Sequence, residues 1–321
     1  MKMQFILGAA ALALLPAAGL AERIYAVDEV GNLIRFDSAT PGVIESSVPL
    51  TGLELDSFRS VGAIDFRPAT GRLYALVDQR YGIPEPPPGA LHGDLYLVDP
   101  GAGACSLIGI AYEVIGMYWG GGFAFSPVDD DIRIFGGDAS NLRMNPNTAE
   151  VSVETPLAPQ YFLAGLAFDH SEAGATASTL YGLDYSSQNL VRIGGVDGVP
   201  PPSGGEATVI GSLGVPFSGF ASFDISPSGT AYAVLSPETE PGVPEPSQLY
   251  TVNLETGAAT LMGAIGPLPG LHIFAMAVAP EGDGQGVIEI PALGPWGLFF
   301  LTVGVGVAGM LRLRRLRPAR R

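Results

Sequence analysis

The sequence predicts an all-β fold, a β-propeller of five four-stranded blades with one transmembrane helix at its C-terminal end. Two repeated phrases and a high content of turn-forming residues support this prediction. The first phrase is an apolar strand, a Pro/Gly turn and a second strand, as in residues 63–76 and 222–235. The second is a strand that ends in Asp or Asn and enters a Thr/Gly turn, as in residues 249–257. With 44 Gly and 28 Pro among 321 residues, short strands separated by turns are expected before residue 290.

Interleaving the two phrases gives units of four strands, which is the unit that a propeller blade requires. Equivalent positions in successive first strands lie 43 to 59 residues apart. The expected strands are 61–66, 72–77, 94–99 and 104–109; then 121–126, 131–135, 141–145 and 150–154; then 164–168, 179–184, 189–193 and 207–210; then 220–225, 230–235, 248–253 and 258–262.

The remaining strands lie at the two ends of the domain. Residues 24–27, 33–37 and 43–48 supply three strands without a first one, and residues 273–279 supply a first strand without followers. Joined, they complete a fifth blade and leave no open sheet edge inside the ring. Six blades is the alternative if a long connection contains further strands. The Pro-rich stretches 83–88, 199–203 and 237–246 are expected to be loops.

Both ends of the chain carry targeting signals. Residues 1–21 have a basic start, an apolar stretch and small residues before a cleavage point after Ala21, as in a signal peptide. Residues 281–289 form a flexible linker, and 290–311 are 22 uncharged residues, about 33 Å as a helix and enough to cross a bilayer. Six arginines in the tail 312–321 predict that this end stays in the cytoplasm. A buried core helix is the alternative at either end.

The C-terminal segment resembles the bacterial sorting signals named for Ile-Pro-Thr-Leu, although Ala292 replaces the usual Thr. The resemblance rests on Ile290, Pro291, Leu293, Trp296 and Gly297. It implies recognition at the membrane by a sorting enzyme, after export by the export machinery, with the protein ending at the cell envelope, at the cell surface or in the secreted fraction.

A second resemblance covers residues 23–280. The segments Asp65-Phe-Arg-Pro-Ala-Thr-Gly-Arg-Leu-Tyr74 and Asn141-Leu-Arg-Met-Asn-Pro146 are similar to signatures of the bacterial family called domain of unknown function 4394. The resemblance implies a propeller-like repeat fold and export. It implies no activity, because none is assigned to the family.

Charge excludes one class of partner. Residues 22–289 contain nine basic and 32 acidic residues, a net charge of −23 that repels nucleic acid.

Cys105 is the single cysteine, so no internal disulfide is available, and it is expected to be a small buried apolar side chain.

The sequence contains no recognisable catalytic or cofactor motif. His92, His170 and His272 are scattered, and no metalloprotease, phosphate-loop or nucleophile-elbow pattern is present. Residues 129–131 are three consecutive Asp, whose oxygens suit Ca²⁺. Their spacing lacks the alternation of a dedicated calcium loop, which favours a solvated turn.

Asp65 and Asp224 occupy the same register in two first strands. If that register faces the central channel, they form part of an acidic ring. If it faces a neighbouring blade, they accept hydrogen bonds from backbone amides there, which is the favoured alternative.

Aromatic residues precede or begin the first strands and predict a rim around the channel mouth. Such a rim suits stacking of a sugar or peptide, whereas packing beneath the loops is the favoured alternative. The candidates are Tyr118, Trp119, Tyr161, Phe162 and Phe220, with Phe58, Phe217 and Phe274 at related positions.

These observations lead to one expected function and two alternatives. We expect an exported, membrane-anchored or sorted propeller that is not an enzyme, needs no cofactor and binds a glycan or peptide. A channel-sited hydrolase or lactonase with bound calcium is one alternative, and a structural matrix component is the other.

Overall fold

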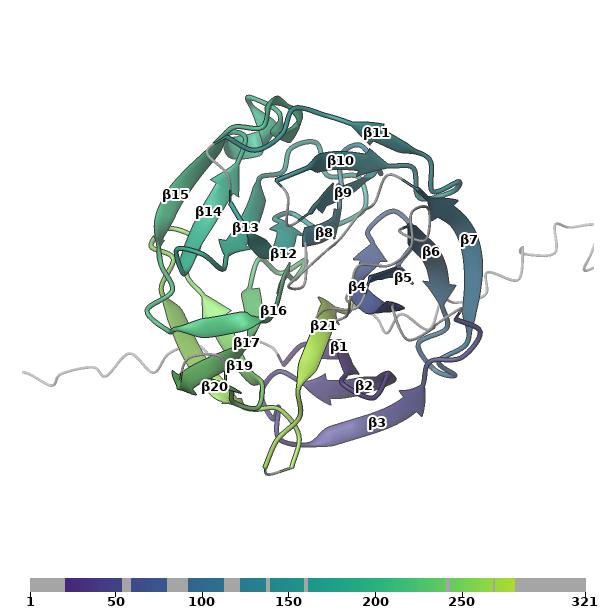
Figure 1. The fold of residues 1–321 in the computed structure, drawn as a ribbon, viewed down its shortest axis with the longest axis vertical. Helices are drawn as coiled ribbons and strands as arrows, with labels where there is room; N and C mark the ends of the chain where they lie inside the picture. Colours follow the sequence, from purple (N-terminus) through teal and green to yellow (C-terminus); the bar gives the residue numbers. More distant parts are fainter. Residues whose placement is uncertain are drawn as a thin grey trace, which may run out of the picture.

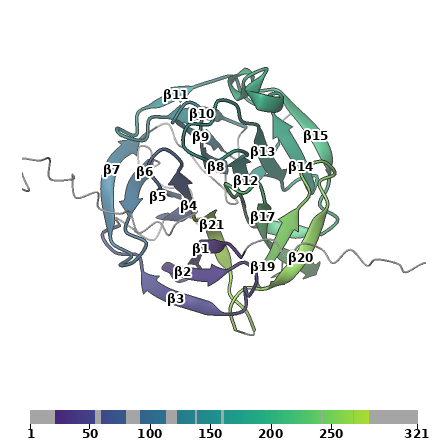
Figure 2. The same ribbon diagram turned by 180° about the vertical axis from the view of Figure 1, so that it is seen from behind.

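The computed structural model describes residues 21–53, 59–79, 92–112, 122–136, 139–158, 161–240, 243–267 and 269–280. Within these residues, the chain forms five antiparallel sheets arranged around one axis (Figure 1). Strands β4, β8, β12, β16 and β21 lie innermost, and β3, β7, β11, β15 and β20 form the circumference, also when seen from behind (Figure 2). The predicted five-bladed β-propeller is confirmed.

The observed strands lie close to the predicted ones. Blade 1 contains β21 (Ile273–Val278), β1 (Arg23–Asp28), β2 (Asn32–Asp37) and β3 (Ile44–Pro49). Blade 2 contains β4 (Arg59–Arg67), β5 (Arg72–Gln79), β6 (Gly93–Val98) and β7 (Cys105–Ala111). Blade 3 contains β8 (Gly122–Phe125), β9 (Ile132–Phe135), β10 (Asn141–Met144) and β11 (Val151–Val153).

Blade 4 contains β12 (Leu163–Phe168), β13 (Leu180–Asp184), β14 (Asn189–Ile193) and β15 (Ala207–Ser212). Blade 5 contains β16 (Phe217–Ile225), β17 (Ala231–Glu240), β19 (Gln248–Val252) and β20 (Ala259–Ala264), with β18 (Val243–Pro244) paired to β17. Two 3-10 turns, η1 (Val196–Gly198) and η2 (Pro202–Gly204), connect β14 to β15. No helix in the described ranges is long and apolar enough to cross a membrane.

Blade 1 closes the ring as the sequence predicts. Strand β21 pairs antiparallel with β1, so that Ile24 lies opposite Val278. The signal peptide, the linker, the transmembrane segment 290–311 and the tail 312–321 lie outside the described residues, apart from Ala21 itself.

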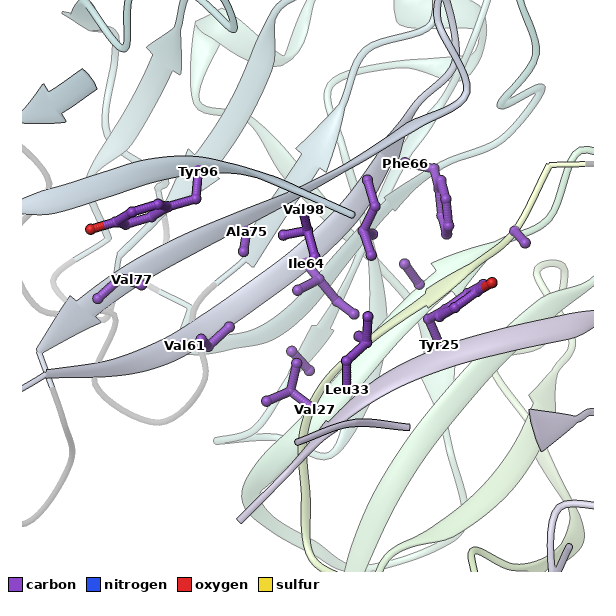
Figure 3. Packing of buried hydrophobic residues seen from close by; sticks show 14 residues of the cluster. Tyr25, Val27, Leu33, Val61, Ile64, Phe66, Ala75, Val77, Tyr96 and Val98 are labelled. Atoms are coloured by element: carbon purple, nitrogen blue, oxygen red, sulfur yellow. The ribbon is translucent and has the colours of Figure 1, made fainter. Parts of the chain in front are cut away.

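Apolar packing between blades forms the core. Tyr25 and Leu33 of blade 1 pack with Ile64 and Phe66 of blade 2 in one buried cluster (Figure 3). The Tyr25 and Phe66 rings meet edge to face, with centroids 5.6 Å apart. Strands β8 and β12 are apolar and buried along their whole length, because each innermost strand lies between two neighbouring blades.

Small residues in the innermost strands admit large ones from the next blade. A Cβ atom on Gly122 would lie 2.2 Å from Leu166 Cγ, and one on Gly165 would lie 2.8 Å from the Cβ and N atoms of Phe223. Glycine is therefore required for close approach at these two positions.

The first repeated phrase also contributes a polar link between blades. Arg67, at the end of β4, is buried; its Nε donates to Asp130 Oδ1 at 2.7 Å and its Nη1 donates to Asn147 Oδ1 at 2.9 Å. Nη1 also donates to the Tyr74 hydroxyl at 3.2 Å, and a second bond to the carboxylate of Asp130 completes a bidentate pair. Because Asp130 and Asn147 belong to blade 3, this guanidinium joins blades 2 and 3.

The second repeated phrase joins blades at the circumference. Thr148 and Thr256 lie in turns between third and fourth strands, where they meet the outer strand of the preceding blade. A Cβ atom on Gly109 of β7 would lie 2.4 Å from the carbonyl oxygen of Thr148, and one on Gly211 of β15 would lie 2.2 Å from that of Thr256. The Thr/Gly turn is therefore part of the contact between blades as well as a chain reversal.

The expectation for one Pro-rich stretch is wrong. Residues 237–240 continue β17, and β18 pairs back onto them, so part of the stretch 237–246 forms an antiparallel extension. Prolines fit in this extension because they lack only the amide donor and their carbonyls still accept: the Glu245 amide donates to the Pro237 carbonyl oxygen at 2.8 Å. Residues 199–203 carry no strand, and residues 83–88 lie outside the described ranges.

Candidate functional site

The ring has two faces that differ in what they carry. We call the side where the innermost strands begin the mouth face and the opposite side the far face. Arg59 begins β4 and Ile273 begins β21 on the mouth face. The described chain enters β1 and leaves β21 on the far face, at Glu22 and Pro280.

The predicted aromatic rim is formed only in part by the described residues. Phe220 and Phe274, from blades 5 and 1, are half-buried and stacked, with ring centroids 5.4 Å apart and planes at 25°. Phe162 is 39% exposed, whereas Tyr161 and Phe217 are buried in the core. Tyr118, Trp119 and Phe58 lie outside the described residues.

The channel carboxylates contact neighbouring blades. Asp65 Oδ2 accepts from the Phe125 amide of blade 3 at 2.8 Å, and Oδ1 accepts from the following amide, that of Phe66, at 2.7 Å. Asp224 repeats this arrangement with Val278 of blade 1 at 2.7 Å and with the next amide in its own strand, also at 2.7 Å. The structure therefore gives the favoured alternative, in which these aspartates bond backbone amides.

Burial changes the acidity of this pair. Burial raises the pKa of Asp224 to about 7, against the lowering effect of its two amide donors. Burial also raises the pKa of Asp65 well above its ordinary value, and the nearby charge of Asp224 raises it further. The pair can therefore hold a proton near neutral pH.

The three consecutive aspartates are not gathered around one point. Asp130 binds Arg67 of blade 2, and Asp131 lies 3.3 Å from Arg143 Nη1. Asp129 donates its amide to Ser126 Oγ at 3.2 Å. The described part of the chain contains no group of three or more His, Cys, Asp or Glu side chains arranged to hold a metal ion.

A charged network on the mouth face was not predicted from the sequence. Arg59 Nη1 donates to Asp94 Oδ2 at 2.7 Å and lies 3.0 Å from His92 Nδ1, and that ring nitrogen lies 2.7 Å from Asp94 Oδ1. Asp94 is only 2% exposed, and Tyr112 packs edge-on against the His92 ring at 5.7 Å. Breaking one hydrogen bond of a buried polar network leaves an unpaired polar group, which is costly. The network therefore holds its side chains in fixed positions.

No sequence signal marks this network. Arg59 begins β4, whereas His92 and Asp94 follow the Pro-rich insertion before β6, more than thirty residues later. His170 has a different environment on the far face, where a hydrogen bond from its Nδ1 to the Asp169 carboxylate raises its pKa.

Next to the network lies a pocket of about 260 Å³ at the junction of blades 1 and 2. Its lining includes Glu29 and Val30 from the β1–β2 turn, Arg59 and Ser60 from β4, and Phe274 from β21. We call it the mouth pocket. The lining includes Phe274, which the sequence places near the predicted aromatic rim. The rim candidate Phe220 does not line the pocket but stacks on the Phe274 ring.

Two other hollows are less suited to binding. The first, about 660 Å³, is an open polar depression at the circumference between blades 2 and 3. Arg143 in its wall already pairs with Asp131 and Glu154. The second, of about 220 Å³, lies on the far face beside Asp129 and Asp197.

Cys105 differs from expectation in being only half-buried. Its Sγ donates to the Gly103 carbonyl at 3.5 Å, and burial raises the pKa of the thiol to about 11. The thiol is therefore a poor nucleophile at neutral pH.

Several solved structures resemble this fold at low sequence identity. One is the GH74 enzyme of Niastella koreensis, with 15% identity and a TM-score of 0.45 over 75% of this chain and 35% of that chain. Another is the GH74 xyloglucanase from Xanthomonas campestris, with 15% identity and a TM-score of 0.45 over 78% of this chain and 37% of that chain. A protein of unknown function from Bacteroides thetaiotaomicron is similar as well, with 14% identity and a TM-score of 0.43 over 81% of this chain and 67% of that chain. The chain spans about a third of the length of the two GH74 proteins.

Sequence comparison gives a family. No curated protein matches the chain. The sequence model of the family described as "Domain of unknown function (DUF4394)" matches residues 32–276, which is most of the propeller. The chain therefore belongs to the DUF4394 family.

Proposed function

We propose that this protein is an exported propeller that binds a glycan or peptide on its mouth face and is not an enzyme. The mouth pocket is the observation that carries the proposal. It combines a stacked aromatic wall with a guanidinium that buried partners hold in place. Concave sites with an apolar wall and a few oriented polar groups are typical of ligand binding.

The positions of the chain ends support an anchored arrangement. Glu22 and Pro280 both lie on the far face, so a tether after residue 280 leaves the mouth face directed away from its attachment. Signal cleavage after Ala21 and a membrane-spanning segment 290–311 are parts of this proposal. Mass spectrometry of the protein from the envelope fraction tests them: a mature chain that begins at Glu22 is expected, and an intact residue 1 would contradict export by this signal.

A binding screen tests the main proposal. The full chain, purified in detergent, is applied to glycan and peptide arrays with detergent alone as the blank. Binding to a defined set of glycans or peptides is expected. Failure to bind either class, with a folded protein by circular dichroism, would refute the proposal.

A channel hydrolase is the second candidate, and the raised pKa of Asp65 and Asp224 favours it, because proton-transfer groups need a pKa near the working pH. Two observations argue against it: each residue is only 8% exposed, and both oxygens of each carboxylate already accept hydrogen bonds from backbone amides. Elemental analysis and a thermal-shift assay with Ca²⁺ test the calcium-dependent form. A stoichiometric metal together with a rise in Tm would support this form. The absence of both would exclude it.

A further inference from the structure

We propose that the mouth pocket binds a single pyranose ring that carries no acidic group, such as a hexose unit of a longer glycan. This inference rests on the proposed function and specifies the ligand class of the same site. Four properties of the pocket lead to it: its apolar wall, its fixed polar groups, its charge and its size.

The apolar wall is held in position by a second aromatic ring. Phe274 lines the pocket and stacks on Phe220 of the neighbouring blade, with planes at 25°. Stacking restricts rotation of the Phe274 ring, so its remaining surface is presented without much further loss of side-chain entropy on binding. A rigid aromatic surface suits the C–H side of a sugar ring.

The polar groups are also fixed before any ligand arrives. Asp94 and His92 hold the Arg59 guanidinium. Asp28 accepts from the amides of Val30 at 3.1 Å and Asn32 at 2.8 Å, which fixes the turn that carries Glu29. Ser60 adds a hydroxyl to the lining. Carboxylate, guanidinium and hydroxyl groups are suited to vicinal hydroxyls, which both donate and accept hydrogen bonds.

Charge disfavours an anionic ligand. Asp94 compensates the charge of Arg59, and the exposed Glu29 makes the pocket unfavourable for anions. The net charge of −23 between residues 22 and 289 adds to that repulsion.

Size limits the ligand to one ring. The volume of about 260 Å³ lies just below the ~300 Å³ at which pockets for drug-sized ligands begin. A longer glycan would place one unit in the pocket and extend along the mouth face.

Titration calorimetry of the full chain with methyl glycosides tests this inference. Methyl glucoside, galactoside and mannoside are compared with methyl glucuronide. We expect at least one neutral glycoside to bind about tenfold more tightly than the glucuronide. A glucuronide that binds as tightly as every neutral sugar would overturn the inference.

Variants locate the site. Phe274→Ala and Glu29→Ala should each weaken binding of the neutral glycoside by about tenfold. Phe162→Ala is the matched control, since this exposed aromatic precedes β12 on the mouth face of blade 4 and does not line the pocket. Glu29 is exposed, so its variant keeps the test decisive even if Phe274→Ala does not fold.

The outcomes separate the two proposals. If an array ligand binds but Phe274→Ala and Glu29→Ala bind it like the native chain, the pocket assignment fails and the proposed function stands. If a neutral peptide rather than a sugar competes for the pocket, the ligand class is wrong. If no glycan or peptide binds at all, both proposals fail.

Discussion

The buried carboxylate Asp224 should make the propeller more stable in mild acid. Its pKa is about 7 in the folded chain against 3.8 as the ordinary value, a rise of roughly three units, and each unit corresponds to about 1.4 kcal/mol. The folded state therefore binds the proton that the unfolded state has released, so stability falls as pH rises through this window. Between pH 5 and pH 7 we expect Asp224 alone to reduce the free energy of unfolding by about 2–3 kcal/mol.

The variant Asp224→Asn separates this effect from the general charge of the domain. The amide cannot titrate, but its NH₂ group faces either the Ile225 or the Val278 amide, which costs about 1–3 kcal/mol. The variant should therefore be less stable than the native chain at pH 5, and the difference should shrink by about 2–3 kcal/mol by pH 8.

Urea unfolding followed by far-UV circular dichroism at pH 5, 6, 7 and 8 measures this difference. Asp99→Asn is the control for removing one negative charge from an exposed turn. Parallel stability curves for the native chain and Asp224→Asn would refute the reasoning, because they would show that Asp224 does not take up its proton in this range.

Two further predictions concern contacts between blades, and thermal unfolding measures both. Gly165→Ala should lower stability by about 1–3 kcal/mol, because its Cβ would lie 2.8 Å from Phe223, whereas Gly204→Ala, with open space around it, should be neutral or slightly stabilising; equal effects would contradict the packing argument. Arg67→Met should cost about 2–3 kcal/mol, because the Asp130 carboxylate loses its bidentate partner. An unchanged Tm would contradict the inferred link between blades 2 and 3.

Much of the fold could be predicted because its information is local. Most strands of a blade follow their neighbours through short turns, with the connections β5–β6 and β14–β15 as longer exceptions, so the two repeated phrases mark most hairpins. The closing strand β21 could be predicted because the count left three strands at one end and one at the other. Residues 237–240 differ from the prediction because Pro normally interrupts a ladder, and the sequence does not show that β18 folds back onto this extension.

The candidate site was less predictable because it depends on contacts between distant segments. The register of Asp65 and Asp224 was readable, but not which way their oxygens point. Arg59, His92 and Asp94 meet only after the ring has formed, and neither their residue types nor their spacing distinguishes them from ordinary surface groups.

The pairing of β21 with β1 has a kinetic consequence. Ile24 cannot meet Val278 until almost the whole propeller sequence between them is present and ordered. Loop closure over such a separation is slow, and contacts of high sequence separation lengthen folding times. The ring is therefore expected to close in a late step, with blades 2 to 5 already formed. Before that step, β1 lacks its pairing partner β21, and the sides of β16 and β4 that pack against β21 are uncovered. Truncation before residue 273 should accordingly yield an open, aggregation-prone array, since it removes the strand that those sides pack against.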